Sequence, residues 1–96
     1  MNKILMFTME SCPYCAMAHR WMKEILDEHP EYKKIEIKIV DEVEHPAYAD
    51  KFDYWYVPTY YVGSVKLHEG VPTKEIIENV YKEAYGESSP PTSSPK

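Results

Sequence analysis

The stretch MESCPYCAMAHR, residues 9–20, contains both cysteines of the 96-residue chain, Cys12 and Cys15. A disulfide between them would close too short a loop to restrict the unfolded chain much, so a structural staple is a poor interpretation. Two cysteines at this spacing can instead form half of a metal site or a redox-active pair. The choice between these depends on where the fold places them.

The flanking sequence predicts that the cysteines lie between a strand and a helix. The segment KILMFT, residues 3–8, is short and apolar from Ile4 to Phe7, which is typical of a buried strand. Pro13 suits the first turn of a helix. Apolar residues recur at three- and four-residue intervals after it, which predicts a helix to about residue 27, before Pro30. Cys12 is therefore expected near the helix N-cap.

The middle of the chain predicts a second strand and a short helix. The segment KIEIKIV, residues 34–40, alternates polar and apolar residues and predicts a half-buried strand with its three isoleucines on one side. A short helix over about residues 45–52 would begin at Pro46. The two predicted strands must be parallel, because a helical crossover joins the first to the second.

The C-terminal part predicts a hairpin and a last helix. Residues 57–62 and 65–69 read as strands on either side of Gly63-Ser64, and glycine first suits a two-residue type II′ turn. Thr73 is a good N-cap for a helix that ends at Gly86. The order strand–helix–strand–helix–strand–strand–helix predicts one α/β domain over residues 1–86. The Ser- and Pro-rich segment 87–96 is expected to be a disordered tail.

Composition limits the partners and the compartment. The net charge is −5 and the eleven Lys and Arg residues are scattered, which argues against a nucleic-acid or anionic-membrane surface. No apolar run approaches the roughly 20 residues of a membrane span, and the N-terminal segment does not resemble a signal peptide. We therefore predict a cytoplasmic protein, where disulfides are normally transient and catalytic, and expect a monomer.

In this setting the two thiols have different predicted roles. A thiol at a helix N-terminus faces unpaired backbone N–H groups and the positive end of the helix dipole, both of which favour the thiolate. Cys12 is thus the expected nucleophile, and Cys15 the thiol that resolves a mixed disulfide on Cys12. A Cys-x-x-Cys motif between a strand and a helix of an α/β chain indicates a thioredoxin-like redox motif.

The segment CPYC after the first strand, with VPT at residues 57–59 opening the hairpin, resembles a glutaredoxin of the thioredoxin superfamily. The resemblance covers residues 2 to about 85. It implies a thioredoxin-like (glutaredoxin) fold with a four-stranded mixed sheet flanked by three helices. It also implies dithiol–disulfide exchange through Cys12, which would reduce disulfides of proteins or of low-molecular-weight thiols. It also implies a cis Val57-Pro58 bond packed against the cysteine pair, with the backbone before the proline binding the substrate as an added strand.

The residues expected to bind substrate surround that motif. The resemblance carries this role to Pro13 and Tyr14, to Val57 and Pro58, and to the helix start at Thr73. Aromatic residues are frequent in binding hot spots, so Trp55 and Tyr56 are candidates too, with Tyr56 preferred. Tyr60 and Tyr61 should point to opposite sheet faces, so at least one belongs to the core or the sheet surface.

The reductant is left open between two classes. Glutaredoxins hold the two carboxylates of glutathione with a basic residue just before the motif and with aspartates at the last helix. Here Glu10 and Ser11 precede Cys12, and Thr73 stands in place of the aspartates. Backbone N–H groups at Thr73 could still accept a carboxylate. Glutathione is a possible electron donor, a thioredoxin-reductase-like flavoprotein is the alternative, and no tightly bound cofactor is expected.

A metal-carrying function is the remaining alternative. Cys12, Cys15 and His19 fall on one helical stripe and offer three ligands, but a fourth from His45 or His68 would depend on the fold. We therefore predict no metal site within one chain and interpret His19 as a helix-surface residue. The resemblance also allows an iron–sulfur cluster held between two chains through Cys12 and glutathione.

Overall fold

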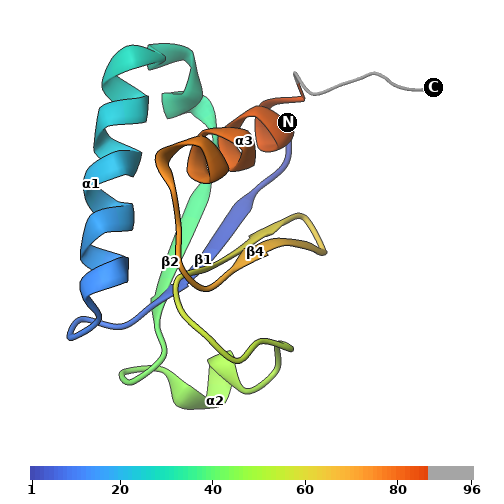
Figure 1. Ribbon diagram of the computed structural model, residues 1–96. Helices are drawn as coiled ribbons and strands as arrows, with labels where there is room; N and C mark the ends of the chain where they lie inside the picture. Colours follow the sequence, from blue (N-terminus) through green and yellow to red (C-terminus); the bar gives the residue numbers. More distant parts are fainter. Residues whose placement is uncertain (87–96) are drawn as a thin grey trace.

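The computed structural model describes residues 1–86; the tail predicted over residues 87–96 lies outside them. One mixed sheet with strand order β2-β1-β3-β4 forms the centre of the molecule (Figure 1). β1 is parallel to β2 and antiparallel to β3, and β3 is antiparallel to β4. The strands are β1 Ile4–Thr8, β2 Ile37–Asp41, β3 Thr59–Val62 and β4 Val65–Glu69. This is the predicted thioredoxin-like α/β fold.

Within residues 1–86, three helices and one 3-10 helix flank the sheet. They are α1 Pro13–Glu28, the 3-10 helix Pro30–Lys34, α2 Pro46–Ala49 and α3 Lys74–Tyr85. Figure 1 shows α1 and α3 on one side of the sheet, with α2 near the end where α1 begins. No helix in residues 1–86 is long and apolar enough to cross a membrane.

Apolar side chains cover both faces of the sheet, which explains why β1 is buried along its whole length. The larger cluster fills the space between the sheet and helices α1 and α3; its fully buried members include Met6, Ile25, Tyr60 and Ile77. The smaller cluster lies on the opposite face, where Phe7 packs with Val40, Ala49 and Tyr61. Tyr60 and Tyr61 thus point to opposite faces, as predicted.

The second strand differs from its predicted pattern. Residues 30–34 form the 3-10 helix, so β2 begins at Ile37. Ile39 is 50% exposed, whereas Val40, expected on the polar side, is 4% exposed. The reason is that β2 is an edge strand of a sheet that is covered on both faces, so neither face of it is uniformly solvent-facing.

The turns that orient the C-terminal half follow the predicted chemistry. Gly63 has φ +59° and lies between the paired residues Val62 and Val65, where a side chain would strain the backbone. The Thr73 hydroxyl accepts a hydrogen bond from the backbone N–H of Ile76 and caps α3. The first residue of α3, Lys74, forms ion pairs with Glu24 and Glu28, so α3 begins beside the C-terminal end of α1.

Candidate active site

Local backbone geometry places Cys12 at the N-cap of α1. After β1 ends at Thr8, the chain turns so that the Cys12 N–H donates to the Met9 carbonyl at 3.1 Å. Pro13 then occupies the first helical position, and the Cys12 carbonyl accepts the first helical hydrogen bond, from Ala16, at 3.1 Å. Both cysteines are free thiols in this structure; Cys12 is 9% exposed and Cys15 is 1% exposed.

Cys15 lies beneath Cys12 in an environment that favours the protonated thiol. Burial raises the pKa of the Cys15 thiol above its ordinary value, and the neighbouring Cys12 thiol raises it further. Hydrogen bonds from the Thr8 hydroxyl and the Met9 backbone act in the opposite direction and lower this pKa, without cancelling the effect of burial. Cys15 therefore needs to lose a proton before it can act as a nucleophile.

The loop before β3 brings a backbone acceptor to Cys12. The Cys12 Sγ lies 3.9 Å from the Val57 carbonyl oxygen, although the two residues are 45 positions apart. The Val57-Pro58 peptide bond is cis, as the resemblance implied. Pro58 is fully buried, which leaves the Val57 backbone as the nearest polar element of this loop to the thiol.

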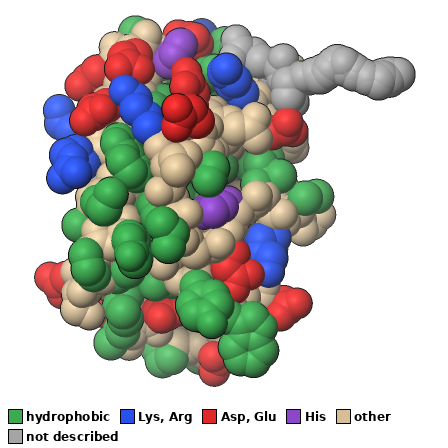
Figure 2. All heavy atoms as spheres, viewed as in Figure 1, with side chains coloured by type: hydrophobic (Ala, Val, Ile, Leu, Met, Phe, Trp, Pro, Cys, Tyr) green, Lys and Arg blue, Asp and Glu red, His purple; other side chains and the backbone are tan. Residues whose placement is uncertain are grey.

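An apolar groove of about 290 Å³ lies on this side of the cysteine pair; its lining residues are Tyr14, Tyr56, Val57, Gly70 and Val71. Tyr14, Tyr56 and Val71 are all substantially exposed. Hydrophobic side chains gather over the end of the molecule where α1 begins, whereas charged side chains concentrate toward α3 (Figure 2). The groove unites Tyr14, Tyr56 and Val57 from the predicted substrate-binding set.

The other predicted substrate-binding residues have different surroundings. Pro13 is exposed at the start of α1, and Pro58 is buried beneath the loop. Thr73 does not line the groove, and its hydroxyl is used to cap α3. Trp55 is 84% exposed and lines a separate hollow next to α2, with Glu42, Pro46 and Tyr54 among its neighbours.

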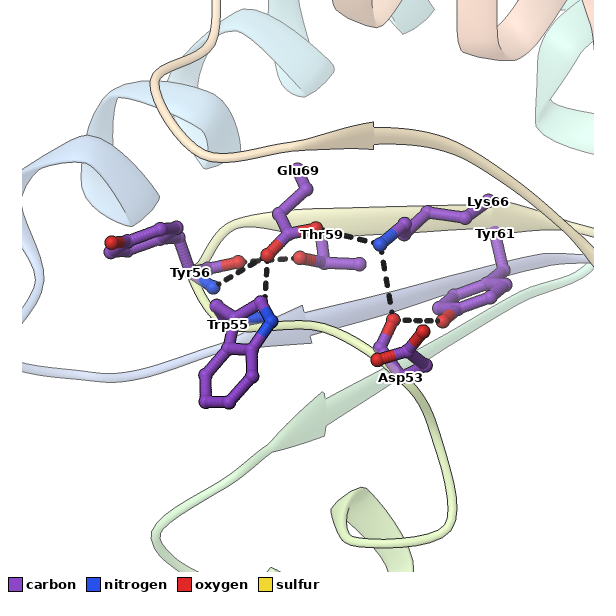
Figure 3. Close-up of polar contacts among 7 residues, drawn as sticks. All are labelled: Asp53, Trp55, Tyr56, Thr59, Tyr61, Lys66 and Glu69. Carbon is purple, nitrogen blue, oxygen red and sulfur yellow. Dashed lines mark hydrogen bonds and ion pairs between the residues drawn. The ribbon is translucent and has the colours of Figure 1, made fainter.

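A buttress from β4 holds the loop that carries the aromatic residues (Figure 3). The Glu69 carboxylate accepts hydrogen bonds from the backbone N–H groups of Trp55 and Tyr56, the latter at 3.0 Å. Lys66 donates to Glu69 at 2.7 Å and to the Asp53 carbonyl at 3.1 Å. Lys66 and the two backbone N–H groups lower the pKa of Glu69, so its carboxylate stays ionised. Two charged residues thus fix the backbone just before Val57.

The opposite side of the cysteine pair is acidic. Two adjoining hollows there share Met9, Glu10, Asp41 and Glu44, and within the described residues no Lys or Arg lines either of them. Asp41 organises this surface, because its carboxylate accepts backbone N–H groups from Glu10 at 3.2 Å and from Val43 at 2.8 Å. Glu10 and Glu44 are left exposed.

His19 also belongs to this acidic side, because it lines one of the two hollows together with Thr8 and Cys15. Its Nε2 lies 3.2 Å from the Thr8 hydroxyl oxygen. Within residues 1–86, no three His, Cys, Asp or Glu side chains come together as a group that could hold a metal ion. His19 thus faces a hydroxyl group rather than completing a ligand set with the cysteines.

Several residues of the site were not predicted. Val71 and Gly70 line the groove, Glu69 buttresses the loop, and Thr8 lines a hollow together with Cys15. The position of Thr8 could have been predicted from the sequence. Thr8 is the last residue of β1, just before the motif, and strand alternation fixes the face of the sheet to which it points. The others depend on how the β3–β4 hairpin folds back toward α1, which no local pattern reveals.

Similar proteins agree with this geometry. No protein-family model matches the chain. A protein named thioredoxin from Methanocaldococcus jannaschii is 31% identical over 80 residues, which cover 83% of this chain and 92% of that protein.

Among solved structures, the oxidised thioredoxin of Plasmodium falciparum superposes with a TM-score of 0.67 at 19% identity, over 85% of this chain and 79% of that one. Thioredoxin 1 of Thermosipho africanus gives a TM-score of 0.59 at 20% identity, over 88% and 94%. The two structures share the fold, and the sequence relative shows the family. The chain is a thioredoxin-like oxidoreductase and belongs to the thioredoxin family.

Proposed function

We propose that this protein is a dithiol reductase of protein disulfides, with Cys12 as nucleophile and Cys15 as resolving thiol. One observation carries the proposal: Cys12 occupies the N-cap of α1 with its Sγ 3.9 Å from the Val57 carbonyl, at the edge of an apolar groove, while Cys15 is buried behind it. A nucleophile at a helix N-terminus beside a peptide-sized groove is suited to attack a disulfide in a bound polypeptide.

The reaction proceeds in two exchanges. The Cys12 thiolate attacks one sulfur of the substrate disulfide, forming a Cys12–substrate disulfide and releasing the first substrate thiolate. The Cys15 thiol loses its proton and attacks the Cys12 sulfur, so that the Cys12–Cys15 bond forms as the second substrate thiolate leaves. The substrate gains two electrons and the cysteine pair loses two, which an external dithiol or thiol donor then restores.

Glu10, Asp41 and Glu44 support a donor other than glutathione. Glutathione carries two carboxylates, and the hollow next to Cys15 presents carboxylates without a lining cation among the described residues. Like charges at a binding surface raise the cost of association and slow it. A flavoprotein reductase of the thioredoxin-reductase class is therefore the favoured donor, and glutathione is the second candidate.

Two variants test the cysteine roles. Cys12→Ser is expected to abolish reduction of a disulfide-containing protein such as insulin by dithiothreitol. Cys15→Ser is expected to accumulate a covalent Cys12–substrate disulfide, visible by intact mass and reversed by reductant. A Cys12→Ser protein that turns over at the wild-type rate would overturn the proposal.

The donor is tested by supplying electrons from each source in turn. The reduction rate of a small glutathione mixed disulfide is measured with glutathione, glutathione reductase and NADPH, and that of insulin with a thioredoxin reductase and NADPH. Turnover only in the second assay is expected. Rapid turnover in the first would assign glutathione as donor while leaving the cysteine roles intact.

A further inference from the structure

The resolving step needs a base, and the polar contacts of Cys15 lead to one. Cys15 is 1% exposed, so bulk water has little access to its thiol. Its side-chain neighbours include Cys12 and Thr8, and Thr8 lines the same hollow as Cys15. The Cys12 sulfur is bonded to the substrate in the mixed disulfide. This leaves the Thr8 hydroxyl as the side-chain route by which the Cys15 proton can leave.

The Thr8 hydroxyl in turn contacts His19, with 3.2 Å between Thr8 Oγ1 and His19 Nε2. Cys15 and His19 are four residues apart on α1, so they lie one above the other on the same helix face. Thr8, at the end of β1, bridges them from the sheet side. The His19 side chain is exposed and lines a surface hollow of about 370 Å³, which opens this path to solvent.

We propose that His19 is the base of the resolving step, accepting the Cys15 proton through the Thr8 hydroxyl. This inference rests on the proposed function. For the transfer, the Thr8 hydroxyl turns so that the Cys15 S–H donates to Thr8 Oγ1 while the Thr8 O–H donates to His19 Nε2. Both protons then shift by one position: Thr8 receives the thiol proton and gives its own to His19. Cys15 attacks Cys12 as the thiolate, and the substrate sulfur leaves with the electron pair of the broken bond.

The surroundings of His19 suit this role. Histidine is the side chain whose ordinary titration lies between pH 5 and 8. The other ionisable groups that face it across the hollow are Glu10 after β1, and Asp41 and Glu44 at the end of β2, besides Cys15 on its own helix. These groups make the hollow polar, and the imidazolium that forms can pass its proton to water there.

The test separates the two chemical steps in a single turnover. The reduced protein is mixed with an uncharged dipyridyl disulfide, whose released thiopyridone absorbs light. The first release reports attack by Cys12 and the second reports resolution by Cys15. Both rates are measured from pH 5.5 to pH 9 in wild type, His19→Gln, Thr8→Val and Thr8→Ser. His29→Gln serves as the control, since it removes an imidazole from the far end of α1.

In wild type, the second phase is expected to reach a plateau within this pH range, because a neutral base accepts the proton. His19→Gln is expected to slow this phase about 10²-fold at pH 7, the lower end of general-base effects, and to make it rise with pH without levelling off. Thr8→Val should behave in the same way, Thr8→Ser should retain the plateau, and combining Thr8→Val with His19→Gln should add nothing. The first phase should stay unchanged in all of them.

The outcomes distinguish this inference from the proposed function. A His19→Gln second phase with the wild-type rate and pH profile would overturn the role of His19, as would an equal change in His29→Gln. A wild-type protein without a first phase, or a first phase that persists in Cys12→Ser, would instead overturn the assignment of Cys12.

Discussion

The two sides of the cysteine pair differ in what they offer a partner. The side of the hairpin presents an apolar groove between Tyr14, Tyr56 and Val71, next to the Val57 carbonyl. The side of β2 presents Glu10 and Glu44 around the path from Cys15 to His19. The same two thiols thus lie between a surface suited to binding a polypeptide and one suited to moving a proton.

This difference explains how one small domain keeps recognition apart from proton transfer. Covering apolar and aromatic surface is energetically favourable, so a substrate segment should remain bound in the groove through both exchanges. Removing water from a carboxylate costs free energy, so the acidic side should remain open to water. Changes on the two sides should therefore affect different kinetic parameters.

Among changes that affect the binding of substrate or donor, the largest expected effect lies in the groove. Tyr56→Ala should lower kcat/KM for a peptide disulfide about 30-fold, because truncating an interface hot spot costs about 2 kcal/mol. Trp55→Ala is the matched control: the neighbouring ring is larger and more exposed, but it lines a different hollow. Steady-state kinetics with a peptide and with a small neutral disulfide would check this, since the small disulfide should be unaffected. Equal losses in both variants would mean that the groove does not select the substrate.

The buttress beneath the groove should have the next largest effect. Glu69→Ala removes the acceptor of the Trp55 and Tyr56 N–H groups and should raise KM for the peptide about tenfold, because misplaced binding groups weaken transition-state contacts. Glu69→Gln keeps an acceptor oxygen and should recover most of the loss. Lys66→Met should have a smaller effect than Glu69→Ala, since it removes the contacts to Asp53 and Glu69 but leaves the Glu69 hydrogen bonds to the loop in place. A kcat effect with unchanged KM would contradict this role.

Reversing a charge on the acidic side should have a smaller effect. Glu10→Lys should raise the rate with a glutathione mixed disulfide about fourfold at low salt, because a two-charge change at roughly 10 Å in water is worth about 0.8 kcal/mol. The gain should fade as added salt screens it. Rates at two ionic strengths, with a neutral disulfide as control, would check this. An equal gain with the neutral substrate would rule out electrostatics as the cause.

The smallest expected effect concerns stability. Burial raises the pKa of the Cys15 thiol, so above the ordinary thiol pKa of about 8.5 the unfolded chain loses this proton before the folded one does. The stability of the reduced protein should therefore be complete below that pH and fall as pH rises toward the folded pKa. Urea unfolding of the reduced form at pH 7 and pH 9.5 would show the fall, and Cys15→Ala should lessen it. Equal pH dependence in both would contradict the assignment.

Much of the architecture was predictable because it depends on local chemistry. The apolar run at Ile4–Phe7, the helix start at Pro13, the turn at Gly63 and the cap at Thr73 each act within a few residues. Their order alone gives the α/β class and a parallel first pair of strands. The pattern of β2 was less predictable, since the exposure of Ile39 and Val40 depends on which elements cover an edge strand.

For the site, the sequence by itself determined the reagent: two thiols three residues apart, at the end of a strand and the start of a helix. It also named Tyr14, Tyr56 and Val57, which the fold gathers into one groove. Only the tertiary structure decided that Glu69 holds the loop, that Val57 reaches Cys12, and that Thr8 and His19 line one hollow with Cys15. The physical reason is distance along the chain: local propensity fixes each element, but contacts between elements follow from sheet register and helix packing.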